Sequence, residues 1–171
     1  DALAKSERFA VTTALSDNEL AKQADLELVI RFLVLHARTN VSQSDLRGRG
    51  ELIDDEAVRI AENFDALRDE LERTFVETFD LMATVGPEVF LKWDTQRERF
   101  TRGFLSTAFE VIAMGAGYHI ARGDGSRTDV LAAVHELWER PEMGSGFATG
   151  QATEVRLARM LPLGRELMAR R

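Results

Sequence analysis

The sequence contains no cysteine among its 171 residues. Disulfide bonds and thiolate chemistry are therefore excluded, and so is the ligand on which most structural zinc sites depend. Only three prolines occur, and segments that alternate between apolar and polar residues, as half-buried strands do, are missing as well. No run approaches the roughly 20 apolar residues of a membrane span, since residues 26–37 are interrupted by Glu27, Arg31 and His36. These absences favour a cytoplasmic protein built mainly from helices.

The chain is instead rich in apolar residues that recur at regular intervals. Hydrophobic residues make up 44% of it, enough for a full core. Their spacing of three and four residues predicts an all-α fold, a single helical bundle of about five to seven helices with one long central helix. The expected helices cover about 2–15, 26–35, 54–85, 101–121, 129–139 and 153–170. Because residues 1–5 resemble the middle of a helix, the chain 1–171 is expected to be one domain and a fragment of a larger protein.

Two of these helices have unusual composition. The helix at 26–35 is apolar on nearly every side, which predicts a buried position, yet it contains Arg31. A buried arginine needs an acidic partner, so we expect a structural ion pair with Asp25 or with an acid from another helix. The alternative is that Arg31 reaches toward a neighbouring domain. The helix at 101–121 carries small residues at 113 and 115–117, which predict that another helix crosses it closely.

The net charge of −7 is unevenly distributed along the chain. Residues 51–91 contain 12 acids and 3 bases, or −9, whereas residues 92–102 contain 4 bases and 2 acids, or +2, and residues 151–171 contain 5 bases and 2 acids, or +3. The acidic middle argues against nucleic acid wrapping the whole surface. The basic segments leave a local DNA contact as one hypothesis, through Arg97, Arg99, Arg102, Arg156, Arg159 and Arg165.

No pattern predicts a catalytic residue, a cofactor or a metal. His135 and Glu139 lie one turn apart on a helix, but two ligands do not complete a metal site. The glycine-bearing stretch 144–150 precedes a helix but lacks both the Gly-Lys-Ser/Thr ending and the strand of a phosphate-binding loop, so we interpret it as a connection. A further hypothesis is a small-molecule pocket beside the 101–121 helix, lined by Glu110, Tyr118 and His119.

Three stretches together resemble one bacterial protein family. Residues 25–33, Asp-Leu-Glu-Leu-Val-Ile-Arg-Phe-Leu, are similar to an Asp-x-Glu segment ending in Arg-Phe in the helical half of the GmrS-like proteins. The stretch from Phe64 to Glu110 is similar to that family's long helix, short aromatic turn and following helix. Residues 153–167, with Arg156, Arg159 and Gly164-Arg165, are similar to its final helix.

The resemblance implies a role in defence against foreign DNA. Members of the family join a ParB/sulfiredoxin-like N-terminal domain to a helical region; they include the GmrSD type IV restriction enzymes and SspE of the phosphorothioation system. They recognise modified or invading DNA and couple nucleotide hydrolysis to cleavage. The family's Asp-Gly-Gln-Gln-Arg-type motif and its HNH motif have no match in this sequence. The resemblance therefore implies a non-catalytic helical interaction domain, whose partner is the ParB-like domain of the same protein, with self-association and DNA as further hypotheses.

Overall fold

The computed structural model describes residues 1–46, 48–101, 103–144 and 152–170. Within these ranges it confirms the all-α class, with eight α-helices and one small antiparallel sheet. The α-helices are α1 (Glu7–Thr13), α2 (Asp17–Ala21), α3 (Ala24–Leu35), α4 (Arg49–Glu62), α5 (Phe64–Ala83), α6 (Ser106–Arg122), α7 (Val130–Glu139) and α8 (Thr153–Met168). The short elements are η1 (Gly86–Phe90), β1 (Trp93–Asp94), β2 (Arg99–Phe100) and η2 (Pro141–Met143). No helix in the described ranges has the length and apolar character needed to cross a bilayer.

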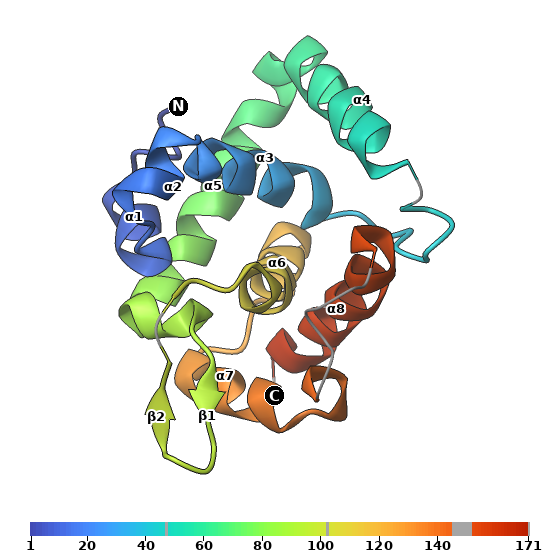
Figure 1. The fold of residues 1–171 in the computed structure, drawn as a ribbon. Helices are drawn as coiled ribbons and strands as arrows, with labels where there is room; N and C mark the ends of the chain where they lie inside the picture. Colours follow the sequence, from blue (N-terminus) through green and yellow to red (C-terminus); the bar gives the residue numbers. More distant parts are fainter. Residues whose placement is uncertain (47, 102, 145–151, 171) are drawn as a thin grey trace.

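Helix α6 occupies the centre of the molecule, with α3, α5, α7 and α8 around it (Figure 1). Twelve of its 17 residues are buried, more than in the other helices described. The prediction that the long helix at 54–85 is central was therefore wrong. Helix α5 presents one apolar stripe, formed by Phe75, Phe79 and Met82, to the core. Helix α6, in contrast, is buried on every side from Thr107 to Gly117.

The long helix expected at 54–85 is divided at Asn63 into α4 and α5. Asn63 has a non-helical φ of −109°, and its side-chain amide donates to the carbonyl oxygen of Arg59 over 2.8 Å. Asparagine favours such breaks because its side chain competes for backbone hydrogen bonds. Helix α4 consequently leaves the line of α5 and lies at the edge of the molecule (Figure 1).

The centre of the core is a cluster of phenylalanine rings drawn from five elements. Phe9 of α1 packs edge-on against Phe79 of α5, with ring centroids 4.9 Å apart, and Phe32 of α3 packs edge-on against Phe75 over 5.5 Å. Phe109 extends the cluster to α6 through Phe79 over 6.2 Å, and Phe90 of η1 joins it. Such aromatic pairs contribute about 0.5–1.5 kcal/mol each beyond their burial. The cluster therefore fixes α1, α3 and α5 against α6.

The predicted close helix crossing is confirmed, and the crossing partner of α6 is α8. A methyl group added at Gly115 would lie 2.3 Å from the carbonyl oxygen of Gly164, and one added at Gly164 would lie 2.2 Å from the carbonyl oxygen of Val111. Both distances are far below van der Waals contact, so the two backbones touch at this point. The glycines thus set the distance between α6 and α8.

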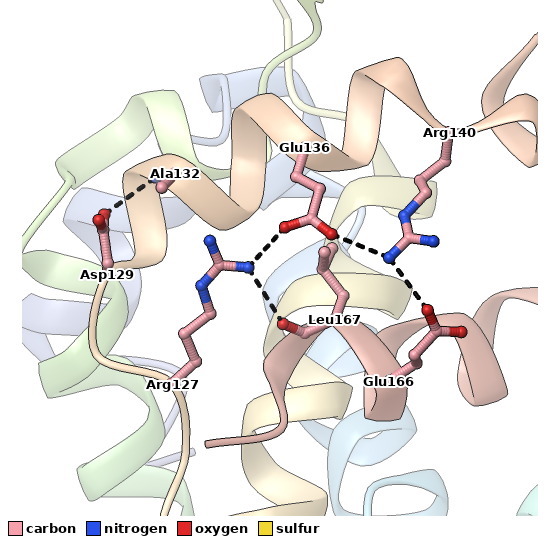
Figure 2. Close-up of polar contacts among 7 residues, drawn as sticks. All are labelled: Arg127, Asp129, Ala132, Glu136, Arg140, Glu166 and Leu167. Carbon is pink, nitrogen blue, oxygen red and sulfur yellow. Dashed lines mark hydrogen bonds and ion pairs between the residues drawn. The ribbon is translucent and has the colours of Figure 1, made fainter. Parts of the chain in front are cut away.

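A second link fixes α8 through charges (Figure 2). Arg127 donates to Glu136 of α7 over 2.8 Å, and Arg140 donates to Glu136 over 2.9 Å and to Glu166 of α8 over 3.0 Å. Arg127 also donates to the carbonyl oxygen of Leu167. These alternating charges join the loop before α7, the end of α7 and the last turn of α8.

Candidate functional site

A buried carboxylate joins three helices in the interior. Glu110 of α6 is completely buried. Arg156 of α8 donates from Nε to Oε2 over 2.8 Å and from Nη2 to Oε1 over 2.7 Å, and Arg31 of α3 donates from Nη1 to Oε1 over 3.2 Å. The hydrogen bonds that Arg156 donates to Glu110 raise the pKa of Arg156. We call Arg31, Glu110 and Arg156 the buried charge cluster; it ties α3 and α8 to the central helix.

The partners of Arg31 are Glu27 on its own helix and Glu110. Among the described residues Asp25 forms no pair with Arg31, so the expected Asp25–Arg31 pair is replaced by the alternative of an acid from another helix. The reason is helical geometry, because Glu27 lies four residues away on the same face and Asp25 lies six residues away, about 120° around the helix. Only 12% of the Arg31 side chain is exposed.

Two of the three arginines predicted on the last helix, Arg156 and Arg165, make internal contacts. Arg156 belongs to the buried charge cluster. The guanidinium of Arg165 lies 4.2 Å from the ring centre of Tyr118 and donates to the carbonyl oxygen of Arg38. Burial lowers the pKa of Arg165, which nevertheless stays charged. A DNA phosphate would have to displace these partners, and Arg159 is the exposed member of the group.

The other predicted basic group lies on the small sheet. Arg97 pairs with Asp94 in the turn between the strands, with 3.4 Å between Nη1 and Oδ2. Arg99 is exposed on β2, and Arg102 lies outside the described residues. The described arginines of this group therefore present a partly neutralised turn.

The small-molecule pocket predicted beside α6 is filled by packing contacts. His119 donates from Nε2 to the carbonyl oxygen of Arg165 over 2.8 Å, and the ring of Tyr118 lies under the Arg165 guanidinium. Both oxygens of Glu110 are engaged by Arg31 and Arg156. These side chains close the interface between α6 and α8.

The candidate metal ligands His135 and Glu139 lie one turn apart on α7. His135 stacks on Trp93, with ring centroids 4.2 Å apart. Within the described ranges no three histidine, aspartate or glutamate side chains gather as a metal site would need. Most of the glycine-bearing stretch 144–150 lies outside the described residues.

The buried histidine His36 has a lowered pKa. His36 is 3% exposed, its ring stacks on Phe32 with centroids 4.8 Å apart, and Nδ1 donates to the carbonyl oxygen of Phe32 over 2.8 Å. Burial lowers the pKa of His36, because the charged imidazolium would lose its hydration. The folded protein therefore keeps this side chain neutral at pH values where the unfolded chain begins to protonate it.

We expect this difference to make stability depend on pH. An unfolded histidine binds a proton near pH 6.5, and the folded one does so at lower pH, so between the two pKa values the unfolded state carries more protons. The contribution of His36 to the free energy of unfolding is fully present above the pKa that it has in the unfolded chain. It is lost as the pH falls toward the lower pKa that it has in the folded protein. Urea unfolding from pH 8 to 5 should show wild type losing more stability than His36→Gln; parallel curves would contradict this assignment.

An apolar groove lies between α3 and α5. Its volume is about 610 Å³. Helix α3 lines it with a stripe at 26, 29, 30 and 33, and α5 contributes Phe64, Arg68, Leu71 and Glu72. Ile60 at the end of α4 and the first three residues of the chain complete the lining. We call this cavity the α3–α5 groove.

Large apolar side chains stand half exposed in the groove. Ile30 is 43% exposed and Phe64 is 50% exposed. The break at Asn63 makes Phe64 the first residue of α5, and its side chain does not enter the core. The sequence contained one signal for this groove, the apolar character of residues 26–35 on every side of the helix. One apolar face of α3 packs in the core, and a second lines the groove. Contiguous exposed apolar surface of this kind marks binding sites.

Comparison with protein-family models, curated proteins and solved structures finds no significant match to this chain in any of the three. Function is therefore inferred from the residues and their geometry.

Proposed function

We propose that the chain is a non-catalytic helical interaction domain that binds a protein partner through the α3–α5 groove. The observation that carries the proposal is the groove itself, an apolar hollow of about 610 Å³ with Ile30 and Phe64 half exposed. Recognition of an apolar helix face by such a groove is a common mode of protein–protein binding. In the buried charge cluster, in contrast, the Glu110 carboxylate accepts hydrogen bonds from Arg31 and Arg156.

We further propose that this domain belongs to a cytoplasmic, GmrS-like DNA-defence protein. Support comes from the place where the three resembling stretches meet, because Arg31 comes from the first, Glu110 from the second and Arg156 from the third. One residue from each resembling stretch thus contributes to the buried charge cluster. The proposed partner is the nucleotide-hydrolysing ParB-like domain of the same protein, with self-association as a second mode. The alternative of a DNA-binding module is not favoured by the geometry, since Arg156 and Arg165 are engaged internally.

Site-specific photo-crosslinking in cells tests the interaction function. A benzophenone amino acid at position 64 points from the groove, and we expect it to crosslink to one polypeptide, or to the ParB-like domain of the same chain. The matched control is position 131 on α7, where Leu131 is 43% exposed but lies outside the groove. Adducts from position 131 that equal those from position 64, or no adduct from position 64, would refute the proposal.

A further inference from the structure

We propose that α4 is an acid-sensitive cover over the end of α3, which is released when the buried His36 side chain takes up a proton. This device does not depend on what the α3–α5 groove binds. It arises from three features of the molecule: the cavity that His36 shares with α4, the tight packing of His36 against α6, and the weak attachment of α4 to the core.

His36 lies in the wall of a cavity of about 200 Å³ between the end of α3, α4 and α5. Helix α4 closes this cavity with Glu56, Arg59 and Ile60, and α5 contributes Glu70 to its wall. His36 is almost completely buried. Removing α4 would open the cavity to water, so hydration of the imidazole depends on the position of α4.

Helix α6 holds His36 at a second contact that cannot yield. A methyl group added at Gly117 would lie 3.3 Å from Cβ of His36 and 2.7 Å from Cζ of Phe32, so the α6 backbone packs directly on this stacked pair. Helix α6 is the buried centre of the molecule, whereas α4 lies at its edge (Figure 1). We therefore expect the movement that hydrates His36 to come from α4.

The proton would enter a cavity that contains charges of both signs. The charged groups that line it together with His36 are Arg38, Glu56, Arg59 and Glu70. Arg59 is paired with Glu56, and Arg165 of α8 donates to the carbonyl oxygen of Arg38, while α6 contributes the uncharged Gly117. Burial lowers the pKa of His36, and the negative charge of Glu70 acts in the opposite direction without reversing the shift.

Nε2 is the atom of His36 that takes up the proton. Nδ1 is hydrogen bonded to the carbonyl oxygen of Phe32, and a carbonyl oxygen can only accept, so Nδ1 carries the hydrogen of the neutral ring. Protonation at Nε2 therefore leaves the contact between His36 and Phe32 in place. The added charge has to be hydrated instead, which the closed cavity opposes.

Helix α4 is weakly attached to the rest of the molecule. Its side chains that pack against the core are Ile53 and Ile60, both only partly buried. The residues at its two ends have non-helical backbone angles, with φ of +73° at Gly48 and −109° at Asn63. We therefore expect α4 to move as a unit about these two residues.

Protonation of His36 and release of α4 are thermodynamically coupled. Once α4 is released, the hydrated imidazole has its ordinary pKa of about 6.5, whereas the pKa in the closed protein is lower. The released state therefore binds the proton more tightly, and its population rises as the pH falls below about 6.5. Between pH 7.5 and pH 5.5 this increase is up to about tenfold.

Single-cysteine labelling tests the coupling, because the chain has no cysteine of its own. Val34→Cys places a thiol at a buried position in the wall of the cavity, and Val89→Cys places one at a buried position of η1, outside the cavity. Labelling by dithiodipyridine, which reacts with thiols at acid pH as well, is measured at pH 7.5 and pH 5.5. Each rate is divided by the rate in the same protein carrying His36→Gln, which cancels the pH dependence of the thiol.

We expect the rate ratio at position 34 to rise up to about tenfold at the lower pH, since labelling follows the open population when closing is fast. Position 34 should also label faster than position 89 at both pH values, because release of α4 does not expose η1. His36→Met, which fills the same space but binds no proton, replaces His36→Gln if that variant does not fold.

His119→Gln is the matched control, because His119 is a partly buried histidine of α6 that does not line the cavity. The acid response at position 34 should persist in this variant, and its loss would overturn the assignment to His36. A rate ratio at position 34 that stays constant between the two pH values also overturns the proposal. Equal labelling rates at positions 34 and 89 would show that the whole protein unfolds, and would overturn the release of α4.

Discussion

Replacing Glu110 by glutamine is expected to lower the free energy of unfolding by about 3–5 kcal/mol, because it removes one partner from a buried set of ions. The glutamine has nearly the same shape, so packing around α6 is preserved and only the charge is lost. Arg31 and Arg156 would then lie in the interior, with side chains 12% and 17% exposed, facing a neutral amide. Urea unfolding of the two proteins at neutral pH measures the difference.

The matched control for this variant is Glu27→Gln. Glu27 pairs with the same Arg31, but 67% of its side chain is exposed, and exposed pairs contribute at most about 1 kcal/mol. A loss for Glu110→Gln no greater than for Glu27→Gln would show that the buried charge cluster does not hold the helices together. Replacing Arg31, Glu110 and Arg156 together by apolar residues should recover much of the loss, since no unpaired charge remains.

Introducing a methyl group at Gly164 is expected to cost about 3 kcal/mol, at the upper end for overpacking. The new Cβ would lie 2.2 Å from the carbonyl oxygen of Val111, and this atom is backbone, so relief requires that α6 and α8 move apart. Alanine gains about 1 kcal/mol over glycine in helix propensity, which makes the expected loss a net value. Thermal unfolding of Gly164→Ala, and of Gly115→Ala from the opposite helix, measures it.

Two comparisons make this prediction specific to the crossing. Gly144→Ala, whose Cβ would lie 3.1 Å from the carbonyl oxygen of Pro141, should change stability by no more than about 1 kcal/mol. The double variant of Gly115 and Gly164 should cost less than the sum of the two, because a single separation of the helices accommodates both methyl groups. Full additivity would mean that the glycines do not face the same contact.

The parts of the fold that could be predicted from sequence follow from local rules. Helical periodicity gave the fold class, and the small residues from 113 to 117 predicted a close crossing because only small side chains permit one. The need of Arg31 for an acid was predictable in the same way. The identity of that acid was not, since Glu110 lies 79 positions further along the chain and only the tertiary fold brings the two together.

The candidate site was less accessible to sequence reasoning. The break at Asn63 lies within a strongly periodic segment, whose apolar spacing predicts one continuous helix. The arginines of α8 illustrate a second limit, because composition counts charges but not their burial. Arg156 and Arg165 look like a phosphate-binding pair in the sequence, and the fold uses both to join helices.

The division at Asn63 also determines how stability is distributed over the molecule. No side chain described in α4 is fully buried, and its anchors to the core are Ile53 and Ile60, which are partly buried. Segments with so little buried surface open at a lower free energy than the global unfolding transition, and their amide hydrogens exchange by local opening. We therefore expect α4 to detach while α6 and α8 stay folded. Because Ile60 lines the α3–α5 groove, each such opening would widen the groove.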